Sequence, residues 1–137
     1  AGQLSFVGGT LYAYDGTRSK WLSVTENIYH WSDSAATAKI LPVGNALDIL
    51  SGFKIPQNAT VVKVTATCSG GNTAKSMEIR KNGAVASLKS FALNSGSYYS
   101  TNDNIDINAG DVLQIYVKGD GASVHDPIVT VYLKWRN

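Results

Sequence analysis

Hydrophobic and polar residues alternate with a period of two along much of the chain. Val62, Val64 and Ala66 alternate with polar residues, and the same alternation runs through Leu113–Val117 and Val129–Trp135. Successive side chains of a β-strand point to opposite faces of a sheet. The pattern therefore predicts strands with one face on a core and the other facing solvent or a partner.

Short turn-forming sequences separate the alternating segments. Asn82–Gly83 follows Met77–Lys81 and predicts a two-residue β-hairpin, because both residues tolerate a positive φ. Asp15–Gly16 predicts a turn between two strands in the same way. Residues 35–50 are the one stretch with room for a helical turn, and Pro42 argues against a long helix there. The sequence thus predicts one all-β domain over residues 1–137, either a sandwich or a closed barrel.

Length, charge and composition limit the classes of partner and metal site that we expect. The 137 residues suffice for one hydrophobic core, and the net charge of +2 comes from scattered cations. We therefore expect no nucleic-acid partner. No apolar run approaches the roughly 20 residues that cross a bilayer, so we expect no membrane partner. Two histidines and one cysteine cannot supply four zinc ligands within one chain.

Candidate chemistry is sparse. His125–Asp126 is an isolated pair and is interpreted as part of an ordinary loop. Asn102–Asn108 is rich in oxygen ligands of the kind calcium prefers, but it lacks the spaced Gly and Glu of a calcium loop. We interpret it as a strand with Ile105 and Ile107 facing inward. The sequence also lacks a G-x-S-x-G element, so we expect no enzyme, no catalytic residue, no cofactor and no metal.

Aromatic residues suit either sugar stacking or packing in a core or subunit interface, and we favour packing. Tyr98 and Tyr99 lie in a Gly/Ser-rich segment and are the pair expected to be exposed for a ligand. Apolar or aromatic residues also occupy both faces of several strands. Such a strand needs a second burial partner, so we expect a self-associating protein with Tyr116, Tyr132 and Trp135 at the interface.

The N-terminal residues 1–25 carry their own alternation. The sequence Leu4-Ser5-Phe6-Val7 would form an ordered strand able to add to a sheet of a neighbouring subunit. Leu4, Phe6 and Val7 are therefore predicted to contact neighbouring subunits.

The second half, from about Val61 to Trp135, resembles the jelly roll of the tumour necrosis factor and complement-globular-head superfamily. Met77–Gly83 is similar to that family's hydrophobic strand closing on a Lys-Asn-Gly hairpin. Ile107–Ile115 is similar to its Gly-Asp element followed by an apolar strand. There Gly110 would supply a turn with positive φ, and Asp111 would cap it by bonding nearby amides. The resemblance implies an antiparallel jelly-roll sandwich and a homotrimer, with aromatic or aliphatic residues facing a threefold axis and no catalytic residue.

Leu11–Ser23 is similar to segments of bacteriophage virion proteins that carry such a domain. In such a segment Arg18 or Lys20 would cover the ring of Trp21. The leading hypothesis is a trimeric capsid decoration (cement) protein on the virion surface, with the major capsid protein as partner. One alternative is the head of a tail or head fibre that binds a host-surface receptor. The other is a bacterial surface or secreted ligand-like module of the same superfamily.

Overall fold

The computed structural model describes residues 2–44, 51–70, 76–93, 96–118 and 123–137. These residues form β-strands joined by turns, without an α-helix among them, and every strand pairing is antiparallel. The predicted all-β class is confirmed.

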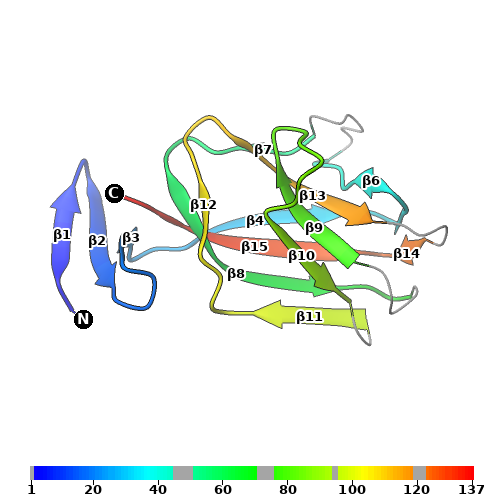
Figure 1. Ribbon diagram of the computed structural model, residues 1–137, viewed down its shortest axis with the longest axis horizontal. Coiled ribbons are helices and arrows are strands. Elements are labelled where there is room, and N and C mark those ends of the chain that lie inside the picture. Colours follow the sequence, from blue (N-terminus) through cyan, green and yellow to red (C-terminus); the bar gives the residue numbers. More distant parts are fainter. Residues whose placement is uncertain (1, 45–50, 71–75, 94–95, 119–122) are drawn as a thin grey trace.

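The strands form two larger sheets, one small sheet and one short pair (Figure 1). The first sheet has the order β10-β9-β13-β6, with β7 also paired to β13; it contains β6 (Lys39–Ile40), β7 (Phe53–Lys54), β9 (Ser76–Lys81), β10 (Lys89–Ala92) and β13 (Val112–Lys118). The second has the order β11-β8-β15-β4, with β12 also paired to β8; it contains β4 (Asn27–Ser32), β8 (Ala59–Thr67), β11 (Ser97–Ser100), β12 (Ile105–Ile107) and β15 (Ile128–Trp135). The N-terminal sheet has the order β1-β2-β3, namely β1 (Leu4–Val7), β2 (Thr10–Asp15) and β3 (Lys20–Ser23). The short pair is β5 (Ala35–Ala36) and β14 (Val124–His125).

One hydrophobic core joins the two larger sheets, which lie across each other in Figure 1. The first sheet contributes Ile79 and Ile115, and the second contributes Val64, Val131 and Trp31, all fully buried. The inward positions follow the period of two, because alternate side chains of a strand share one face. Burial of these side chains removes apolar surface from water, which favours folding.

The segment expected to hold a helical turn forms short strands and bends, without a helix, where it is described. β5 and β6 lie within residues 35–44, and residues 45–50 lie outside the described residues.

The expected two-residue hairpin at Asn82–Gly83 is only partly correct. Both residues have a positive φ, 55° and 70°, and Ala84 N donates to Lys81 O, as in a type I′ turn. The next strand does not resume at once, however, because β10 begins at Lys89, opposite Ile79. The turn contacts the neighbouring strand β13 instead of β10. The chain then forms a loop up to residue 88 before β10 pairs with β9.

Strand β8 contains a β-bulge that the sequence pattern did not indicate. Val64 pairs with Val131 and Val61 with Leu133, so Val62 is an extra residue on β8. Val62 was expected to face the core with Val64. It is 4% exposed but lies outside the main core cluster, because the bulge turns it to the outer face of the sheet.

Candidate functional site

The N-terminal sheet stands at one end of the molecule, beyond the two larger sheets (Figure 1). Cross-strand partners point to the same side of a sheet, so strand register defines its two faces. One face consists of two apolar rows that we call the N-terminal apolar face: Phe6, Leu11 and Val24; Leu4, Ala13 and Leu22. Phe6 is 72% exposed and Leu4 is 64% exposed, whereas Leu22 is buried. Large exposed apolar residues in adjacent strands are typical of an interaction surface.

The predicted contact residues divide between the two sides of β1. Leu4 and Phe6 lie on the N-terminal apolar face, and Val7 is exposed on the opposite face. Within the described part of the chain, β1 pairs with β2 alone, so its other edge keeps unpaired backbone groups. Such an edge can accept a strand from another polypeptide.

Arg18, in the β2–β3 turn, connects the N-terminal sheet to the second sheet and its flanking loop through hydrogen bonds. Its Nε donates to Asp103 O at 2.7 Å, and its Nη2 donates to Thr101 O at 3.0 Å and to Val62 O at 3.2 Å. Its Nη1 lies 2.6 Å from Asp15 Oδ2. A guanidinium satisfies several carbonyl groups at once, so this one side chain fixes the orientation of the turn.

The expectation that Arg18 or Lys20 covers Trp21 is wrong. No cation of the described residues lies over that indole ring, which packs edge-on against Tyr14 with ring centres 5.6 Å apart. Arg18 is drawn away by the backbone carbonyl groups, which require donors when they are buried. The ammonium group of Lys20 instead donates hydrogen bonds to Asn104 Oδ1 and Asp106 Oδ1.

A second polar cluster, around Asp106, supports the same junction. Lys20 Nζ lies 2.6 Å from Asp106 Oδ1, Thr60 Oγ1 donates to the same oxygen at 2.8 Å, and Arg136 Nη1 lies 3.5 Å from Oδ2. Burial opposes ionisation of this carboxyl, but the hydrogen bonds and positive charges outweigh burial and lower its pKa below the ordinary value. Leu22 and Arg136 also form a backbone bridge between the two parts. The N-terminal sheet is therefore a fixed element.

The two tyrosines expected to contact a ligand have different surroundings. Tyr98 stacks on Phe91 with ring centres 4.6 Å apart and packs against the core. Tyr99, next along β11, is 69% exposed. Of the pair, Tyr99 alone presents its ring to solvent, because neighbouring residues of a strand face opposite sides.

The structure does not bring the three predicted interface residues together. Tyr116 lies on the outer face of the first sheet, with the Arg80 guanidinium 3.5 Å from its ring centre. Tyr132 lies on the outer face of the second sheet, with Lys63 Nζ 4.1 Å from its ring centre. Trp135 packs against the core. These residues therefore occupy three separate environments.

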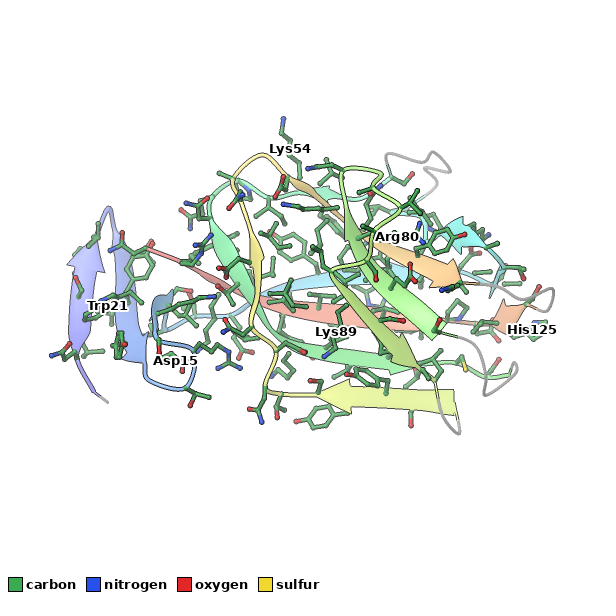
Figure 2. The ribbon with its side chains drawn as sticks, in the orientation of Figure 1. Asp15, Trp21, Lys54, Arg80, Lys89 and His125 are labelled. Carbon is green, nitrogen blue, oxygen red and sulfur yellow. The ribbon has the colours of Figure 1, made fainter. Side chains whose placement is uncertain are left out.

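Two polar side chains near the candidate chemistry, Ser69 and Asp103, are paired with neighbouring side chains. Ser69 Oγ donates to Asp126 Oδ2, while His125 beside it is exposed at the end of the molecule opposite Trp21 (Figure 2). Asp103 is paired with Lys89. Over the described ranges, no three His, Cys, Asp or Glu side chains gather as metal ligands would.

The strand predicted within Asn102–Asn108 is confirmed as β12. Ile107 is buried, Ile105 is half-buried and packs on the core, and Asp106 between them faces outward.

A comparison with profiles of known protein families finds no match, and a comparison with curated proteins finds no similar sequence. The described residues include no helix long and apolar enough to span a membrane.

Proposed function

We propose that the chain is a homotrimeric jelly roll of the tumour necrosis factor and complement-globular-head kind that serves as a capsid decoration protein. In this role it binds the major capsid protein on the outside of a bacteriophage head and adds no chemistry of its own. It caps positions where capsid subunits meet and resists the pressure of the packaged DNA.

The connections between the two larger sheets support a jelly roll. Along the chain, β8 belongs to the second sheet, β9 and β10 to the first, β11 and β12 to the second, β13 to the first and β15 to the second. Two antiparallel sheets exchanging strands in this way are the arrangement of a double-sheet jelly roll.

The outer face of the second sheet supports self-association. Ile28 on β4 pairs with Tyr132 on β15 and is 62% exposed, and Ile128 on the same face is 43% exposed. An exposed sheet face normally carries polar residues, so these apolar side chains favour burial against another copy. Of the three residues predicted from the sequence, Tyr132 is the best placed for the trimer contact.

The observation that carries the functional proposal is the N-terminal sheet itself. It exposes Phe6 and Leu4 on an apolar face, and Arg18 ties its β2–β3 turn to the second sheet and its flanking loop through three hydrogen bonds. Rigid presentation of an apolar surface lowers the entropic cost of binding. Three such faces in a trimer would add weak contacts into strong attachment to a shell.

A fibre head that binds a receptor is the second candidate, and exposed Tyr99 favours it. Aromatic rings of this kind contact carbohydrates and proteins alike. The two candidates differ in the surface used: decoration requires the N-terminal apolar face, and receptor binding requires the region around Tyr99.

Rebinding to shells that lack the protein tests the proposal. Phe6→Ser should reduce binding at least about tenfold, as expected for loss of a large buried side chain at an interface. Val85→Ser is the matched control, because Val85 is 83% exposed in the loop before β10 and should leave binding unchanged. Equal binding by both variants, or loss of binding with Tyr99→Ser alone, would contradict the decoration role.

A further inference from the structure

A small open pocket lies where the N-terminal sheet meets the outer face of the second sheet. Its volume is about 170 Å³. The lining combines three cations, one carboxylate, one hydroxyl and one apolar side chain: Arg18, Lys63, Lys134, Glu26, Thr101 and Val62. No aromatic ring contributes to this lining.

The bulge in β8 builds this pocket. The extra residue, Val62, is turned to the outer face, where it lines the pocket beside Lys63. The carbonyl of Val62 accepts from Arg18 Nη2, which brings the guanidinium to the same place. Bulges commonly re-aim side chains at binding sites. The pocket is therefore a product of specific backbone geometry and of the junction with the N-terminal sheet.

The charges of the lining do not cancel. Lys63 Nζ is 3.2 Å from Glu26 Oε2, and Arg18 is paired with Asp15. Lys134 pairs through its backbone with Thr60 of β8, but its ammonium group forms no ion pair or hydrogen bond with any described residue. An ammonium group has three N–H donors and no acceptor. The pocket thus retains a positive charge whose donors are free for a ligand.

We propose that this pocket binds one carboxylate group of a partner polypeptide, an Asp or Glu side chain that pairs with Lys134 beside the hydroxyl of Thr101. The volume favours a single side-chain head, because pockets for whole small molecules are roughly 300–1,000 Å³. The absence of an aromatic ring from the lining argues against a sugar ring as the occupant. The site does not depend on the decoration role, because none of its lining residues belongs to the N-terminal apolar face.

An NMR titration with N-acetylglutamate α-methylamide, which carries one carboxylate, tests the site. The backbone amide signals of Lys63, Thr101 and Lys134 should shift saturably, with a millimolar dissociation constant. Lys134→Gln should weaken binding at least about tenfold by removing a charge-assisted hydrogen bond. Lys134→Arg should restore binding to within about threefold, because it keeps the charge and the donors.

Lys54→Gln is the matched control, since Lys54 projects into solvent from the first sheet (Figure 2) and also lacks an ion pair with any described residue. It should leave the titration unchanged. Absence of saturable shifts, or equal affinity in Lys134→Gln with an otherwise unchanged spectrum, would overturn the proposal. Tighter binding of glucuronate than of the acyclic probe would assign the pocket to an acidic sugar and also overturn it.

Discussion

The side chain of Asn82 is hydrogen-bonded to the carboxylate of Asp111, with Nδ2 donating to Oδ1 at 2.7 Å. Asn82 Oδ1 also accepts from Val112 N at 2.7 Å, and Asp111 Oδ2 accepts from Asn108 N at 3.0 Å. The Lys-Asn-Gly turn and the Gly-Asp turn, the two sequence features on which the proposed superfamily resemblance rests, therefore contact each other. Their contact fixes the end of β9 against the beginning of β13.

Loss of the Asn82 side chain should destabilise the protein. Asn82→Gly keeps the positive φ accessible but removes both hydrogen bonds, so we expect the free energy of unfolding to fall by about 1–2 kcal/mol. Asn102→Gly is the control, because Asn102 is exposed and should change the value by less than about 0.5 kcal/mol. Urea denaturation measures both variants; equal effects would mean that the turn contact contributes nothing.

The type I′ turn also requires a residue at position 83 that tolerates a positive φ. Gly83→Val should lower the free energy of unfolding by at least about 1–2 kcal/mol, because a β-branched residue is strained at the φ of 70° found there. Gly16→Val is the comparison: Gly16 lacks a positive φ, and a Cβ there meets no atom within 4 Å. Thermal melts in which the two variants unfold at the same temperature would refute the turn assignment.

Acid stability depends on Asp106. Its pKa is lowered in the folded protein relative to the ordinary 3.8, so its contribution is present above that value and is lost as the pH falls through the folded pKa. Asp106→Asn should be less stable than the parent at neutral pH, and the difference should shrink below about pH 4. Denaturation curves at several pH values measure that difference. A gap that stays constant with pH would show that the ion pairs around Asp106 add no stability.

The period of two predicted the strands and the core because alternate residues of a strand lie on the same face of the sheet. Ile115 and Val131, for example, lie on the faces that form the core. It could not predict the contacts of Arg18, since Asp103 lies 85 residues away and chain proximity alone does not bring them together. It also misplaced Val62, because Val62-Lys63-Val64 reads as regular alternation. The bulge arises from pairing with β15, which a single strand does not encode.

The proposed trimer makes a prediction about mass. Light scattering should give three times the chain mass of 14.6 kDa. Tyr132→Glu should shift the protein toward the monomer, because it buries a charge in the proposed contact. Tyr116→Glu, on the outer face of the other sheet, should remain trimeric. A mass of 14.6 kDa for the parent protein over micromolar concentrations would count against the trimer.

The central claim is that this protein stabilises a shell, and heating of virions tests it most directly. Particles stripped of the protein should release their DNA at a lower temperature than intact particles, and adding the protein back should restore the higher temperature. Adsorption to host cells should not change. An unchanged release temperature together with a collapse of adsorption would contradict the claim and support the fibre-head alternative.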